Sequence, residues 1–152
     1  MNLAIFISTL FGVGYFPKAP GTAGTVVAAC IYWLLPISWL VEFPANLIFL
    51  ISVLVFSLIS VFFISKAEEK LGHDSGKIVI DEFLGYMIAV AFLPKTFFML
   101  ILSFILFRIF DIFKPEPVNM LQKLPRGWGV LADDLMAGIY SNLAIRFILI
   151  VK

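Results

Sequence analysis

Long apolar stretches alternate with short polar ones along this chain. The apolar stretches cover residues 3–16, 26–41, 43–64, 83–93, 96–107 and 135–151. A membrane-spanning helix needs about 20 apolar residues, and residues 43–64 reach that length without a charge. Residues 78–94 are barely long enough to cross the membrane, and they do so only if Asp81 and Glu82 enter it. The pattern predicts an all-α fold, an integral membrane helical bundle with short spans.

Positive charge collects in three polar stretches, residues 15–21, 65–80 and 114–130. They contain Lys18, Lys66, Lys70, Lys77, Lys114, Lys123 and Arg126. The positive-inside rule places these loops on the cytoplasmic side. The chain then runs outward over 26–41 and back over 43–64, forms a hairpin over 83–107, and leaves over 135–151. Residues 3–16 fit either a span or an interfacial helix.

Composition excludes several classes of protein. Hydrophobic residues make up 62% of the chain and charged residues 14%, with 17 phenylalanines, whereas soluble domains are near 45–50% and 25%. A net charge of +1 without a basic stripe argues against nucleic-acid binding. The single cysteine, Cys30, cannot form an intramolecular disulfide. Without repeats or linkers, residues 1–152 are expected to form one domain.

Five acidic residues lie beside apolar helices, where each costs roughly 3 kcal/mol at the bilayer centre. They are Asp81, Glu82, Asp111, Asp133 and Asp134. The predicted topology brings them to the cytoplasmic ends of three helices. A glycine follows Asp81 and Asp134 four residues later, on the same helical face, where it lets helices approach closely. The sequence therefore predicts one acidic cluster.

The predicted cluster suits a hard cation and a phosphate. Oxygen ligands favour Mg²⁺, and only His73 and Cys30 could supply the ligands that zinc prefers. Candidate phosphate-binding groups on the same side are Lys18, Thr22, Thr25, Arg108 and Lys114. The two threonines follow Gly21 at the start of a predicted helix, whose N-terminal dipole favours an anion.

Four motifs resemble the phosphatidylglycerophosphatase A family. They are PGTAGT at 20–25, HDSGKIVIDEFLG at 73–85, FRIFDIFKPEP at 107–117 and GWGVLADDLMAG at 127–138. The resemblance implies a Mg²⁺-dependent enzyme of the bacterial inner (cytoplasmic) membrane that converts phosphatidylglycerophosphate to phosphatidylglycerol, with its active site facing the cytoplasm. It also carries the catalytic and metal-binding roles onto Asp81, Glu82, Asp111, Asp133 and Asp134.

Several alternatives stay open at the level of sequence. One or two Mg²⁺ ions fit the five acids, and either water or a carboxylate could attack the phosphorus. A carboxylate-based cation or proton transporter is the alternative function. Transport sites usually lie near the bilayer midplane, whereas these acids lie at predicted helix ends beside basic loops, which favours the enzyme. No feature of the sequence fixes an oligomeric state.

Overall fold

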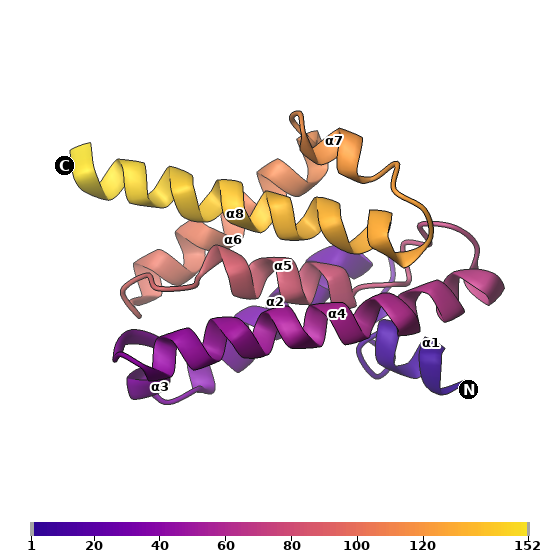
Figure 1. Ribbon diagram of the computed structural model, residues 1–152, viewed down its shortest axis with the longest axis horizontal. Helices are drawn as coiled ribbons and strands as arrows, with labels where there is room; N and C mark the ends of the chain where they lie inside the picture. Colours follow the sequence, from indigo (N-terminus) through magenta and orange to yellow (C-terminus); the bar gives the residue numbers. More distant parts are fainter. Residues whose placement is uncertain (1, 152) are drawn as a thin grey trace.

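The computed structural model describes residues 2–151, and every regular element in that range is helical. The all-α prediction is therefore confirmed. In chain order the elements are α1 (Leu3–Ser8), η1 (Val13–Tyr15), α2 (Pro20–Leu34), α3 (Ile37–Val41), α4 (Ala45–Leu71), α5 (Ile80–Ala89), α6 (Phe97–Phe113), α7 (Val118–Leu121) and α8 (Gly127–Val151). The longer helices lie roughly along one axis (Figure 1).

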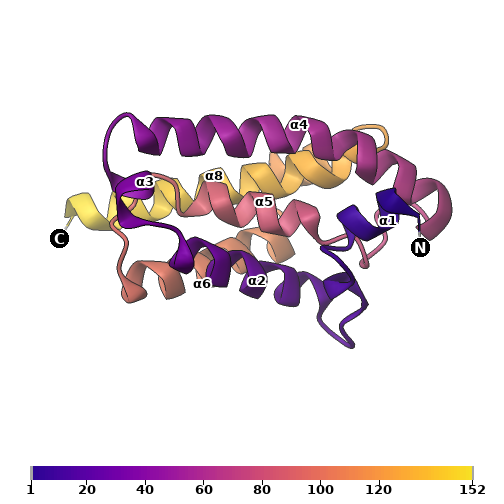
Figure 2. The same ribbon diagram turned by 90° about the horizontal axis from the view of Figure 1, so that it is seen from below.

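The short helix α5 forms the centre of the bundle. It packs most extensively against α8 and also contacts α2, α4 and α6 (Figures 1 and 2). Every α5 residue except Glu82 and Phe83 is buried. Ten residues span only about 15 Å, half of a bilayer core. Such a helix is stable at membrane depth because protein, rather than lipid, surrounds its ends.

Polar side chains from α8 satisfy the C-terminal end of α5. The Asn142 amide donates to the carbonyls of Ala89 and Ala91 at 3.0 and 2.8 Å. Arg146 Nε donates in turn to Asn142 Oδ1 at 2.7 Å. These bonds replace the water that the last carbonyls of a helix otherwise need, so α5 ends inside the bundle without unpaired backbone groups at these positions.

Two helices, α4 and α8, are long and apolar enough to cross a membrane. Exposed apolar side chains along α4 include Ile51, Val55, Ile59 and Phe62. An exposed apolar surface of this kind suits lipid contact. The fold therefore agrees with the predicted membrane helical bundle. The N-terminal helix α1 has six residues, about 9 Å, and is too short to span.

The largest departure from the predicted boundaries is in α8. The apolar stretch suggested a span from residue 135, but the helix begins at Gly127 and carries Asp133 and Asp134 in its second turn. The first turn of α8 is fixed against α4. The Gly127 amide donates to Ser65 Oγ at 3.1 Å, and a Cβ on Gly127 would lie 2.7 Å from the Val61 carbonyl oxygen. Both aspartates are therefore inside the helix, as the shared helical face of Asp134 and Gly138 indicated for Asp134.

Pro36 divides the first long apolar segment into α2 and α3. Leu35 adopts an extended conformation, with φ −63° and ψ 146°, as residues before proline prefer. The Lys95 ammonium donates to the carbonyls of Trp33 and Leu35 at 2.6 and 2.5 Å. This bonding ties the end of α2 to the turn before α6.

Candidate active site

Four helices bring the predicted site residues together. The helices α2, α5 and α8 run in the same direction, and α6 runs against them (Figures 1 and 2). The first turns of α2 and α5 therefore meet the second turn of α8 and the last turns of α6. This arrangement brings helix ends from distant parts of the sequence together, as expected from the predicted topology.

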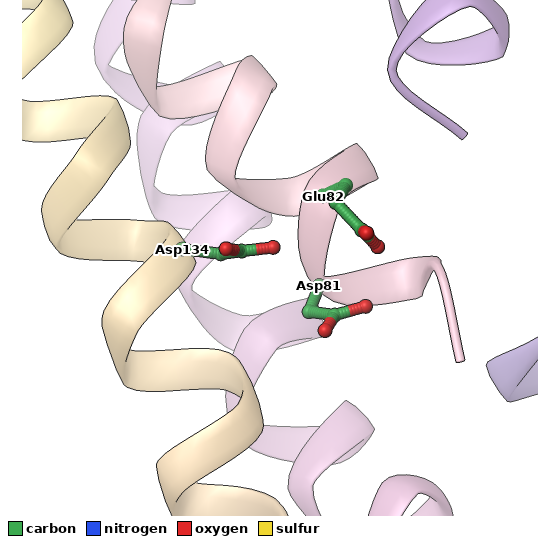
Figure 3. A group of neighbouring side chains, drawn as sticks. All are labelled: Asp81, Glu82 and Asp134. Atoms are coloured by element: carbon green, nitrogen blue, oxygen red, sulfur yellow. The ribbon is translucent and has the colours of Figure 1, made fainter. Parts of the chain in front are cut away.

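A group of three carboxylates forms the centre of the site. Oxygen atoms of Asp81, Glu82 and Asp134 all lie within 4.8 Å of one another. Asp134 extends from α8 toward the first turn of α5, which carries the other two (Figure 3). Asp81 and Asp134 are only 6% and 3% exposed. Negative groups this close and this buried need a positive partner to stay charged.

Two oxygen atoms of this group lack hydrogen-bond partners among residues 2–151. They are Asp81 Oδ1 and Glu82 Oε2, both buried. Buried polar atoms are nearly always paired with protein, water or an ion. The unpaired oxygens therefore indicate a position that a ligand or ion would complete.

Close contact between α5 and α8 depends on two glycines. A Cβ on Gly85 would lie 2.6 Å from the Asp134 carbonyl oxygen and 2.8 Å from the Phe107 ring. A Cβ on Gly138 would collide with the Gly85 carbonyl. The backbones therefore touch, which holds Asp81 next to Asp134. The close approach predicted from the glycine spacing is confirmed.

The other two predicted acids form ion pairs. Arg108 Nη1 lies 2.5 Å from Asp111 Oδ2, one helical turn away on α6. Lys114 Nζ lies 2.5 Å from Asp133 Oδ2 on α8. Burial disfavours the charged form of Lys114, but the Asp133 hydrogen bond and nearby carboxylates outweigh it and raise the Lys114 pKa above its ordinary value. Its positive charge is therefore secure at neutral pH.

Arg108 keeps a free donor beside the three carboxylates. Its Nε is buried without a partner among the described residues, while Nη1 is paired with Asp111. A guanidinium can bind two oxygens in parallel. Arg108 is thus positioned to bind an anion while Asp111 fixes its orientation.

The N-terminus of α2 is the third positive element of the site. A Cβ on Gly21 would meet Glu82 Oε1 and lie 3.2 Å from Arg108 Nη1, so the absence of a side chain lets these two groups approach the start of α2. The N-cap residue, Ala19, provides no side-chain cap. The free N–H groups in the first turn of a helix favour an anion.

The three remaining candidates differ in their surroundings. Thr25 is fully buried, and its hydroxyl donates to the Gly21 carbonyl at 2.9 Å. Thr22 is half-buried in the first turn of α2, and Lys18 is exposed in the preceding loop. The structure therefore gives Thr25 a partner within its own helix, and among the described residues it shows no hydrogen bond or ion pair that joins the side chains of Thr22 or Lys18 to the carboxylates.

Comparison with known proteins establishes the family. Residues 6–149 match the sequence model described as "Phosphatidylglycerophosphatase A". The chain belongs to the phosphatidylglycerophosphatase A family. Phosphatidylglycerophosphatase A of Haemophilus influenzae is 37% identical over 152 residues, covering 95% of this chain and 88% of the relative. The Escherichia coli protein of that name is 32% identical over 141 residues, covering 91% and 78%.

A relative with a different name is equally similar. A "Putative phosphatidylinositol-3-phosphatase" of Bacteroides thetaiotaomicron is 38% identical over 150 residues, covering 94% of this chain and 91% of that protein. No solved structure matches. Membership of the phosphatidylglycerophosphatase A family makes the protein a phosphatase, a phosphoric monoester hydrolase, and favours the enzyme over the transporter.

Sequence reasoning missed two features of this family member. It did not foresee that Gly21 lets α2 touch Glu82, although a glycine directly after a helix-starting proline was a usable signal. It also missed Asn142 as the group that completes α5. Asn142 and Arg146 follow Gly138 at intervals of four residues, so all three share the face of α8 that meets α5.

Proposed function

We propose that this protein is a Mg²⁺-dependent lipid phosphatase that converts phosphatidylglycerophosphate to phosphatidylglycerol at the cytoplasmic face of the bacterial inner membrane. The observation that carries the proposal is the convergence of Asp81, Glu82 and Asp134 within 4.8 Å. The names of the Haemophilus and Escherichia relatives supply the substrate. The basic loops of the sequence supply the orientation.

The donor set fits Mg²⁺. All three central ligands are carboxylates, and two of their buried oxygens have no partner among the described residues. Asp81, Glu82 and Asp134 would hold the ion, with Asp111 and Asp133 completing the acidic surroundings. Bound Mg²⁺ neutralises phosphate oxygens and lowers the pKa of a coordinated water.

The residues of the chain bind and orient the phosphate. Arg108 donates to it through Nε, Lys114 adds a positive charge, and the first turn of α2, whose Gly21 lies beside Glu82 and Arg108, adds N–H donors. The motif that contains Thr22, together with the basic charge of Lys18 before it, supports their assignment to phosphate binding. Asp111 and Asp133 hold the two cations in place, so that these donors are preorganised before the substrate arrives.

Two routes of attack are compatible with this site. In the first, a carboxylate accepts a proton from water, the water oxygen bonds to phosphorus, and the lipid alkoxide leaves with a proton. In the second, a carboxylate oxygen bonds to phosphorus as the bond to the lipid oxygen breaks and the lipid alcohol leaves with a proton; water then cleaves the acyl phosphate, which releases inorganic phosphate and restores the carboxylate. Labelled phosphate trapped on the protein would support the second route. Solvent ¹⁸O in the released phosphate, with no trapped species, would support the first.

A phosphorylated inositol lipid is the second candidate substrate. The Bacteroides relative carries that name at an identity as high as that of the others. Both lipids present a phosphate monoester on a polyol headgroup, so the cations and carboxylates described above serve either. Parallel assays with the two lipids in identical micelles decide between them, since the proposal expects the higher kcat/KM for phosphatidylglycerophosphate.

Phosphate release from the purified protein tests the proposed function. We expect release from phosphatidylglycerophosphate to stop in EDTA and to return with added Mg²⁺. Asp81→Asn is expected to lower kcat at least about 100-fold, because it removes a buried charge from the reacting centre. Glu69→Gln, a matched control at an exposed ion pair, retains full activity. Undiminished release in EDTA would contradict the metal assignment.

A further inference from the structure

An apolar cavity of about 840 Å³ lies between α2, α4 and α5. Both α2 and α4 pack against α5, and an aromatic contact between Tyr32 and Phe49 bridges them, with ring centroids 6.4 Å apart. Figure 2 shows α5 between these two helices. The cavity walls include Val27 and Ile31 of α2 and Met87 of α5.

One end of the cavity lies beside the acidic site. Ile80 and Phe83 line the cavity, and in α5 they directly flank Asp81 and Glu82. The cavity and the site therefore share the first turn of α5. None of the three carboxylates lines the cavity, so the apolar compartment and the acidic site are neighbours at this turn.

The cavity is long enough for a whole acyl chain. Its lining along α4 runs from Ala45 to Ser60, about 22 Å at 1.5 Å per residue. One leaflet of a bilayer has a hydrocarbon depth of about 15 Å, half of the ~30 Å core. A chain that starts beside α5's first turn can therefore extend along the cavity for its full length.

The lining of the cavity is almost entirely apolar. No charged residue contributes to it, and its polar side chains are Ser52 and Ser60. The Ser52 hydroxyl is already bonded to the Ile48 carbonyl at 2.8 Å. A pocket of this volume with apolar walls favours a hydrocarbon ligand.

We propose that this cavity binds one acyl chain of the lipid substrate while its phosphate lies at Asp81, Glu82 and Asp134. The proposal rests on the proposed function and adds to it the way in which the lipid is held. Binding energy from a part of the substrate remote from the reaction fixes the position of the headgroup. The enzyme then discriminates by chain length as well as by headgroup.

Two neighbouring valines provide a matched test. Val27 lines the cavity, whereas Val26 is 46% exposed and does not line it. Val27→Trp projects a ring into the cavity and obstructs it, whereas Val26→Trp points a ring outward. Phosphate release is measured with long-chain phosphatidylglycerophosphate and with the same headgroup on short acyl chains. We expect Val27→Trp to lower kcat/KM for the long-chain lipid about tenfold or more, with the short-chain value unchanged, and Val26→Trp to alter neither.

A second pair keeps the test decisive if Val27→Trp fails to fold in size-exclusion chromatography. Ser52→Trp obstructs the cavity from α4, and the neighbouring Ile51, 50% exposed, gives the control Ile51→Trp. The same selective loss on the long-chain lipid is expected.

Three outcomes would overturn the proposal. Equal loss on both lipids would show damage to the site instead of loss of chain binding. Full activity in both cavity variants would show that the cavity does not bind the acyl chain of the reacting lipid. Absence of release by the wild-type protein from either lipid would contradict the proposed function itself, which separates that failure from the other two.

Discussion

The two sides of α5 are built in opposite ways. Toward α8 the backbones touch through Gly85 and Gly138, and buried carboxylates lie at the contact. Toward α4 and the part of α2 that follows its first turn, the helix faces an open apolar cavity of about 840 Å³, lined on α2 by Val27 and Ile31. The close contact with α8 fixes the positions of the charged groups, whereas the open side leaves room for an acyl chain. One central helix thus supports chemistry on one face and offers space for lipid on the other.

The difference also concerns stability. The α5–α8 contact stabilises the bundle through close packing, yet it brings together carboxylates that repel each other in the absence of a cation. The cavity lowers the packing density beside α5 without bringing charged groups together. Substitutions on the two sides of α5 should therefore change enzymatic activity and thermal stability to different extents.

The largest effect is expected from Asp134→Asn. It is expected to lower phosphate release at least about 100-fold, because Asp134 is one of the three converging carboxylates. In EDTA its Tm is expected to equal or exceed that of the wild type, because one of the mutually repelling charges is gone. Thermal unfolding in detergent, beside the activity assay, checks both. A lower Tm with intact activity would contradict the claim that these carboxylates repel each other and take part in the reaction.

Gly138→Ala is expected to damage packing and activity together. Its Cβ would collide with the Gly85 carbonyl, and overpacking of this kind costs about 1–3 kcal/mol. The control Gly76→Ala adds the same methyl group where no atom lies within 4 Å. Thermal unfolding of both variants provides the measurement. Equal Tm values for the two would show that α5 and α8 are not held at contact distance.

Arg108→Lys is expected to weaken substrate binding about tenfold while the protein stays folded. A lysine retains the charge but loses the guanidinium that binds Asp111 and an anion at once. Steady-state kinetics should show the change mainly in KM. An unchanged KM would show that Arg108 pairs with Asp111 but does not bind the substrate.

The smallest effect is expected from Lys66→Ala. This residue forms an exposed ion pair with Glu69 on the part of α4 beyond the cavity, and such pairs contribute about 0–1 kcal/mol. Activity should be unchanged and Tm nearly so. A large loss of activity would place a functional surface outside both faces of α5.

Much of the site was predictable because it depends on local spacing. The intervals Asp81–Gly85 and Asp134–Gly138 indicated helices in contact, and the contact is present. Arg108 and Asp111 share a helical face at an interval of three, and they are paired. Lys114 and Asp133 also pair, but they lie on different elements, so sequence spacing could not select that partner over the other acids.

The boundaries and the cavity were beyond the reach of sequence patterns. The start of α8 depends on glycines that pack against α4 and the preceding loop, which hydropathy does not report. The helix α4 is apolar on every side, so its cavity-lining residues resemble those that face lipid. Only the positions of neighbouring helices distinguish them.

Binding of Mn²⁺, an oxygen-preferring substitute for Mg²⁺, tests the central claim most directly. Electron paramagnetic resonance reports the free ion as the purified protein is added. We predict saturable loss of the free Mn²⁺ signal with wild-type protein and with Glu69→Gln, and little loss with Asp81→Asn or Asp134→Asn. Equal binding by all four proteins would contradict the claim that these carboxylates converge to hold a divalent cation.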